Sequence, residues 1–175
     1  MLTAALVACA PRAPGASATT RRELAAAEAA LAAKDYDRAL AAHDRAVTGA
    51  PDDASRALAL RERADTRLLT GDLTGGADDL AALAALRPRD AAAWHDLGVV
   101  RANLGDRAGA AEALTRAKTA APDDPRPRLA LAALRWADGD RAGARLEYQA
   151  LLALDLADRV RAKVEWAIGE LRDAE

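Results

Sequence analysis

A six-residue string that returns after a fixed interval constrains the fold of this chain more than any other feature. Residues 105–110 read Gly-Asp-Arg-Ala-Gly-Ala, and residues 139–144 repeat them letter for letter, 34 positions later. A Gly-Asp pair also stands 34 positions earlier, at Gly71 and Asp72. Self-similarity at such a period is typical of proteins built from stacked repeats, in which each repeat contacts its neighbours. The sequence therefore predicts a repeat array.

Two recurring markers set the limits of the repeats. The Gly-Asp steps and the prolines Pro51, Pro88 and Pro122 agree on one register, in which three extra residues (54–56) lie between the first two units. We expect these three residues to lengthen a turn or a helix start. The predicted organisation is a tether at 1–19, an array at 20–158 and a capping helix at 159–175, and the units of the array are 20–53, 57–90, 91–124 and 125–158.

The composition predicts that each unit consists of helices. Apolar residues make up 51% of the chain and aromatic residues only 3%, so that Ala and Leu dominate the apolar set. Ala and Leu have high helix propensity, whereas the residues that favour strands are scarce. Glycine favours the end of a helix, and aspartate favours the start of the next one. We therefore predict an all-α chain of helix hairpins, with the Gly-Asp step at the turn inside each hairpin.

The third unit resembles the tetratricopeptide repeat (TPR), whose pattern is W-x2-L-G-x2-Y, A-x3-F and P over 34 residues. The matching residues are Trp94, Leu97, Gly98, Ala110, Leu114 and Pro122. Arg101 stands where the family has Tyr. The resemblance implies a right-handed superhelical solenoid of about four hairpins with a C-terminal capping helix. It also implies that Trp94 is a large buried residue beside a close helix crossing at Gly98 and Ala110.

The resemblance further implies a concave groove, lined by the first helix of each hairpin, that holds a partner protein or peptide. The groove positions in units two to four are Arg61, Glu62, Asp65, His95, Asp96, Val99, Asn103, Leu129, Ala133 and Trp136, and unit one adds Leu24, Glu28 and Leu31. The groove is acidic towards unit two and apolar towards unit four, which favours a peptide with a basic end and an apolar end. Trp136 is the expected anchor, because exposed tryptophans dominate binding energy at interfaces. The alternative is that Trp136 packs under the capping helix.

The N-terminal residues resemble a bacterial lipoprotein signal. Leu6-Val7-Ala8-Cys9 matches a lipobox, in which the cysteine receives lipid, and residues 10–19 have the composition of a flexible tether. Met1 to Ala8 contain no Lys or Arg, although a signal peptide begins with positive charge. The primary hypothesis is thus a membrane-tethered scaffold of the cell envelope, anchored through Cys9. The alternative is a soluble cytoplasmic adaptor or regulatory module without lipid.

The sequence argues against an enzyme, a metal site or a nucleic-acid surface. The chain has two histidines and one cysteine, and neither His43 nor His95 has a second His or Cys at metal-binding spacing. His43 occupies a packing position of the repeat. The 25 basic and 27 acidic residues are mixed along the chain, which is unlike the basic stripe of a nucleic-acid-binding protein. We expect no cofactor and no catalytic residues.

Overall fold

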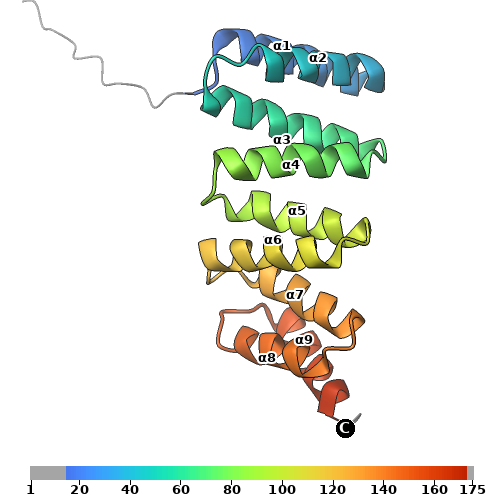
Figure 1. Ribbon diagram of the computed structural model, residues 1–175, viewed down its shortest axis with the longest axis vertical. Helices are drawn as coiled ribbons and strands as arrows, with labels where there is room; N and C mark the ends of the chain where they lie inside the picture. The colour runs from blue at the N-terminus through green and yellow to red at the C-terminus, as the bar shows by residue number, and fades with distance from the viewer. Residues whose placement is uncertain (1–14, 173–175) are drawn as a thin grey trace, which may run out of the picture. The chain divides into compact units, whose positions relative to one another are not determined.

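Residues 15–172 are described by the computed structural model, and all regular secondary structure within them is α-helical (Figure 1). The helices are α1 (Ala18–Ala32), α2 (Tyr36–Thr48), α3 (Asp53–Leu69), α4 (Leu73–Leu86), α5 (Ala91–Asn103), α6 (Arg107–Ala120), α7 (Pro125–Ala137), α8 (Arg141–Leu151) and α9 (Asp158–Arg172). The prediction of an all-α chain is therefore confirmed. The chain forms two compact units, Met1–Arg63 and Ala64–Glu175, and the division falls within α3.

The turns inside the hairpins need a residue with a left-handed backbone. Gly71, Gly105 and Gly139 have φ values of 86°, 83° and 81°. Residues with a Cβ rarely adopt this region, whereas glycine enters it without steric cost. Lys34 takes the same place in the first hairpin, with a φ of 58°. The predicted use of glycine to end the first helix of a hairpin is thus confirmed in the later hairpins.

The aspartates that follow these residues begin the second helices. In the third hairpin the Asp106 carboxylate accepts a hydrogen bond of 2.9 Å from the backbone N–H of Gly109. The corresponding carboxylates accept from the same position of their own helices: Asp35 from Arg38, Asp72 from Gly75 and Asp140 from Gly143. Each bond satisfies a backbone donor that has no partner within the helix. Asp90 and Asp124, which had no predicted role, cap α5 and α7, with Asp90 accepting from Ala93 three residues on and Asp124 from Arg126 two residues on.

An arginine closes the turn from the other side. Arg101, which replaces the usual Tyr, donates from Nη1 to the carbonyl oxygen of Gly109 at 3.3 Å, and its Nε lies 3.7 Å from Oδ2 of Asp106. The second and fourth hairpins repeat the bond to the carbonyl, with Arg67 donating to Gly75 at 3.2 Å and Arg135 to Gly143 at 3.4 Å. A guanidinium carries several donors in a fixed plane, so it can hold a carbonyl and a carboxylate together. The arginine therefore stabilises the turn by linking the end of the first helix to the start of the second.

The helices of a hairpin cross where their side chains are smallest. In the third hairpin, Gly98 of α5 meets Ala110 of α6. A Cβ built on Gly98 would lie 2.6 Å from Cγ of Leu114, which is itself buried. Carbon atoms in contact are normally 3.5–4.0 Å apart. The predicted role of small residues at the crossing is thus confirmed, and Leu114 is the large residue that fills the space beside it.

The three extra residues between the first two units lengthen the start of α3. This helix has 17 residues and contains 54–56 in its first turn. Ser55 is fully buried, and its Oγ accepts a hydrogen bond of 2.9 Å from the backbone N–H of Ser17. Ser17 in turn caps α1, which begins at Ala18. The extra turn of α3 therefore holds the start of α1 within the first compact unit.

Trp94 does not occupy the core, and its predicted burial is wrong. The side chain is half-buried, its Nε1 donates to the carbonyl oxygen of Pro88 at 3.0 Å, and the guanidinium of Arg116 lies 4.7 Å from the ring centroid. The buried face of α5 is filled instead by Ala93, Leu97 and Val100. The tryptophan is therefore a half-buried residue that packs against the turn before α5 and against Arg116 of α6.

Candidate binding pocket

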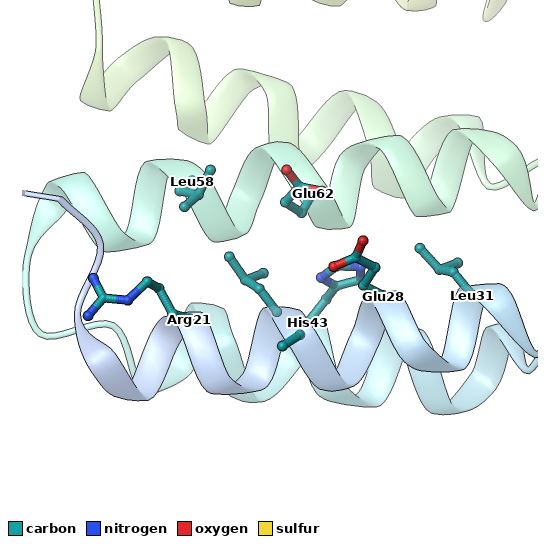
Figure 2. Close-up of a pocket in the computed structure, with 8 residues that line it drawn as sticks. Arg21, Glu28, Leu31, His43, Leu58 and Glu62 are labelled. Carbon is teal, nitrogen blue, oxygen red and sulfur yellow. The ribbon is translucent and has the colours of Figure 1, made fainter.

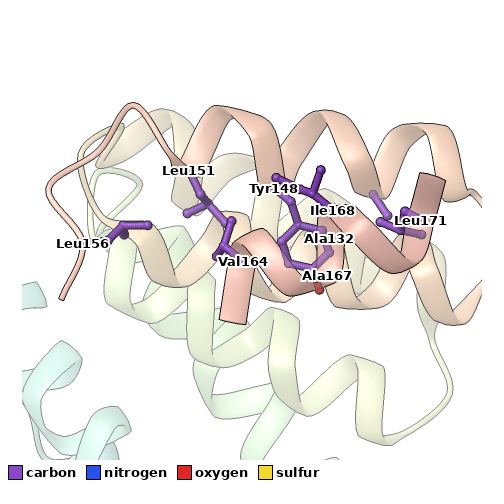
Figure 3. Close-up of a cluster of buried hydrophobic side chains, with 9 residues drawn as sticks. Ala132, Tyr148, Leu151, Leu156, Val164, Ala167, Ile168 and Leu171 are labelled. Carbon is purple, nitrogen blue, oxygen red and sulfur yellow. The ribbon is translucent and has the colours of Figure 1, made fainter. Parts of the chain in front are cut away.

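An open cavity of about 620 Å³ lies among α7, α8 and α9 in the second compact unit. We call it the aromatic pocket. It is lined by Leu129, Ala133, Trp136, Tyr148, Val160, Lys163, Val164, Trp166 and Ala167. Tyr148, Val164 and Ala167 also belong to the buried cluster that joins α9 to the last hairpin (Figure 3). The packed core of this end of the chain therefore forms one wall of the pocket.

Helical spacing explains why these side chains meet. Leu129, Ala133 and Trp136 lie at i, i+4 and i+7 of α7, which places them on one face. Val160, Val164 and Ala167 have the same spacing on α9. Small residues at Ala133 and Ala167 leave open space between larger neighbours. The pocket thus follows from two apolar stripes that face each other across a row of small side chains.

Three aromatic rings give the pocket a fixed shape. The Trp136 ring lies 6.2 Å from the Tyr148 ring in an edge-to-face arrangement of 86°, and 6.2 Å from the Trp166 ring at 32°. Tyr148 is only 8% exposed, and burial raises the pKa of its hydroxyl. Trp166 is 63% exposed despite its size. The pocket therefore has a buried aromatic wall and an exposed aromatic rim.

Lys163 is the only charged residue that lines the aromatic pocket. It is exposed, and within residues 15–172 it makes no hydrogen bond or ion pair. Two other cations of this unit have an anionic partner, because the Glu147 carboxylate of α8 accepts from Lys118 at 2.7 Å and from Arg128 at 3.3 Å. An uncompensated positive charge therefore lies beside an apolar cavity.

The structure brings three of the predicted groove residues together in the aromatic pocket: Leu129, Ala133 and Trp136. Trp136 is partly buried against Trp166 of the capping helix. It therefore lines a cavity and also makes the packing contact that the alternative interpretation expected. Tyr148, Val160, Lys163 and Trp166 were not predicted as site residues. A signal for Lys163 was present, because it lies 34 positions after Leu129 and so continues the repeat register into α9.

The predicted residues of α5 do not line this pocket. Val99 and Asn103 are exposed, and His95 Nδ1 lies 3.1 Å from Oδ1 of Asp96. The pKa of Asp124, at the start of α7, is lowered chiefly by its hydrogen bond to Arg126, with a smaller contribution from His95. Among the described residues, none of these α5 side chains lines a cavity together with the aromatic pocket residues.

The remaining predicted residues lie on α3. Asp65 is exposed, and Arg61 is half-buried. Glu62 lines a second cavity of about 490 Å³ in the first compact unit, together with Arg21, Leu24, Ala25, Glu28, Leu31, His43 and Leu58 (Figure 2). His43 is 2% exposed, so its predicted packing position is confirmed. Leu24, Glu28 and Leu31 thus share a cavity as the repeat register implied.

The described residues were also searched for metal sites and membrane spans. Between residues 15 and 172, no group of three or more His, Cys, Asp or Glu side chains could hold a metal ion. No helix in that range is both long and apolar enough to cross a bilayer. Cys9, the predicted lipidation site, lies outside the described residues.

Comparison with known proteins identifies the fold. No protein-family model and no curated protein matches the sequence. Among solved structures, MamA superposes with a TM-score of 0.75 and 17% identity, over 89% of this chain and 81% of its own. A tetratricopeptide repeat protein from Parabacteroides merdae gives 0.78 and 11%, over 90% and 62%. The type III secretion chaperone SycD of Yersinia enterocolitica, in complex with a peptide of the translocator YopD, gives 0.60 and 17%, over 65% and 89%. The chain therefore has the tetratricopeptide-repeat fold that its third unit predicts.

Proposed function

We propose that this chain is a non-enzymatic interaction scaffold that binds a segment of a partner protein in the aromatic pocket. The observation that carries the proposal is the exposed ring of Trp166 beside the partly buried Trp136, at the mouth of an apolar cavity. Large exposed aromatic residues beside a cavity mark binding sites, because covering them removes apolar area from water. SycD, which shares the fold, holds a peptide, and this supports the proposal by analogy of fold alone.

The dimensions of the pocket fit one or two bulky side chains of a partner. Its volume of about 620 Å³ lies within the range of about 300–1,000 Å³ that is usual for ligand sites. Tyr148 and Val164 are buried in the core cluster, so the wall exists before any partner binds. A preformed wall reduces the entropy that association must overcome. An apolar side chain such as Leu, Met or Phe is the expected anchor.

A matched pair of substitutions tests the pocket. Peptides selected from a displayed random library on the full chain provide the probes, and fluorescence anisotropy gives their dissociation constants. Ala133→Leu fills the pocket from an exposed position of α7, whereas Ala162→Leu makes the same change on an exposed position of α9 that does not line the pocket. We expect Ala133→Leu to weaken binding by about tenfold or more, which is about 1.4 kcal/mol. Equal affinity for both variants would place the binding site elsewhere.

The membrane-anchored form of the scaffold remains a proposal supported by sequence alone. Leu6-Val7-Ala8-Cys9 supplies the lipobox match, and residues 10–16 have the composition of a tether. The predicted tether of 10–19 is too long, because Ser17 caps α1 and Thr19 lies within that helix. A lipid on Cys9 would tether the scaffold to a membrane of the cell envelope. A soluble cytoplasmic adaptor would use the same pocket without the anchor. The two forms differ in the chemical state of Cys9, which fractionation can test.

A further inference from the structure

We infer that the aromatic pocket selects partner segments in which a carboxylate lies next to the apolar anchor. The inference rests on the proposed function and adds a charge to the chemistry of the ligand. The basis is Lys163, which lines the pocket and has no ion pair within residues 15–172. The sequence predicts a basic end of the peptide towards unit two. The carboxylate inferred here is compatible with that expectation, because it lies beside the apolar anchor at the other end of the peptide.

The position of Lys163 on α9 directs its charge to the pocket mouth. Val160 and Val164 flank it and line the same cavity, so its alkyl stem lies along an apolar wall while the ammonium group stays in water. Arg159 lies one turn earlier on the same side of the helix and is also exposed. Glu165 lies on the other side of α9 and does not line the pocket, and Glu170, two turns after Lys163, does not line it either. Asp155, just before α9, and Asp158, its first residue, do not line the pocket either, so Lys163 is the charged side chain that an anchor in the pocket meets among the described residues.

Comparison with other cations of this unit shows why the charge of Lys163 is available. Lys118 and Arg128 are held by Glu147, and Arg107 is paired with Asp138. These side chains stabilise contacts between helices. Lys163 has no such contact, so it can pair with an incoming carboxylate without breaking an existing bond. A cationic ligand would bring like charges together, and their repulsion would weaken binding.

Three probes of nearly equal shape test this selection: 4-phenylbutyrate, 4-phenylbutanamide and 4-phenylbutylamine. Each offers a phenyl anchor, with a negative, neutral or positive end at pH 7. Quenching of tryptophan fluorescence in the full chain, excited at 295 nm, gives the dissociation constants. We expect the carboxylate to bind about fivefold to tenfold more tightly than the amide, and the amine to bind most weakly; tenfold corresponds to about 1.4 kcal/mol. The preference should fall as salt is raised from 20 to 500 mM.

Two charge-matched variants assign the effect to Lys163. Lys163→Gln should make the carboxylate and the amide bind equally, while the affinity for the amide stays unchanged. Arg89→Gln removes the same charge from a residue of this unit that does not line the pocket, and should keep the preference. Equal binding of all three probes to the original chain would overturn the charge selection but would still support binding of an apolar anchor in the pocket. Failure of every probe to saturate would overturn the pocket itself, and with it the proposed function. A concentration-dependent dimer that the probes dissociate would assign the pocket to a second copy and overturn the inference.

Discussion

Replacing Gly98 by alanine should destabilise the chain, although the same substitution in a helix usually stabilises it. Glycine within a helix is about 1 kcal/mol less favourable than alanine. At Gly98, however, the new Cβ would lie 2.6 Å from Cγ and 2.9 Å from Cδ2 of Leu114, and 3.2 Å from the carbonyl oxygen of Ala110. Leu114 is buried, so it has little room to move. The helices of the third hairpin must separate or Leu114 must leave its rotamer.

The magnitude follows from two opposing terms. Overpacking a core by one methyl group typically costs about 1–3 kcal/mol. Subtracting the helix-propensity gain of about 1 kcal/mol leaves a net loss of between zero and about 2 kcal/mol. Gly169 of α9 provides the control, because a Cβ built there meets nothing within 4 Å. Gly169→Ala should therefore keep the full gain, and the free energies of unfolding of the two variants should differ by about 1–3 kcal/mol.

Urea unfolding followed by circular dichroism measures both variants, with the midpoint and the m-value fitted separately. A third variant identifies the source of the loss. In a Leu114→Ala background the obstructing side chain is absent, so Gly98→Ala should become stabilising. Equal stabilisation by Gly98→Ala and Gly169→Ala in the original chain would refute the account of the helix crossing.

Three further predictions concern other parts of the chain. Trp94→Ala should lower the free energy of unfolding in urea by about 1–2 kcal/mol, because the ring is half-buried and packs under Arg116. The same change at a fully buried tryptophan would lower it by roughly 3–5 kcal/mol, and a loss in that range would place the ring in the core. Glu147→Gln should cost about 2 kcal/mol, since the charges of Lys118 and Arg128 lose their shared partner, whereas the exposed pair between Glu112 and Arg116 should cost under about 1 kcal/mol when Glu112 is changed in the same way. Cys9→Ser should move the protein from the membrane to the soluble fraction of source cells that express it with its upstream sequence, and an unmodified Cys9 by mass spectrometry would end the lipoprotein hypothesis.

The features that could be predicted from the sequence have local causes. A turn needs a left-handed backbone, and a helix start needs an acceptor for its free N–H groups. A Gly-Asp pair such as Gly105-Asp106 therefore predicts a turn followed by a helix in each unit that contains it. The small residues of the helix crossing belong to the same class. Their effect depends on neighbours within a single hairpin, which repeat in the same register. The sequence therefore predicts the all-α array of hairpins from these features.

The aromatic pocket depends on contacts between elements that do not repeat in the same way. The interpretation of 159–175 as a capping helix gave no reason to expect Lys163 in a site, because Lys163 and Trp166 line a pocket with α7 and α8 only once the chain has folded. For Trp94 the sequence predicts too much burial, since the family pattern implies a core residue and the ring is half-buried. A family pattern gives the position of a residue in a repeat, but its burial depends on the side chains around it, and here Ala93, Leu97 and Val100 form the buried face of α5.

The arginines at the turns of the second, third and fourth hairpins allow such a chain to change in length by whole units. Arg101, Asp106 and Gly109 belong to one 34-residue unit, so a duplicated or excised unit takes the donor, the carboxylate and the carbonyl with it. No turn is left with an unpaired group at the new junction. Arrays of this kind can thus gain or lose whole units while each unit keeps its own turn contacts. The surfaces that bind partners can then diverge at the ends of the array.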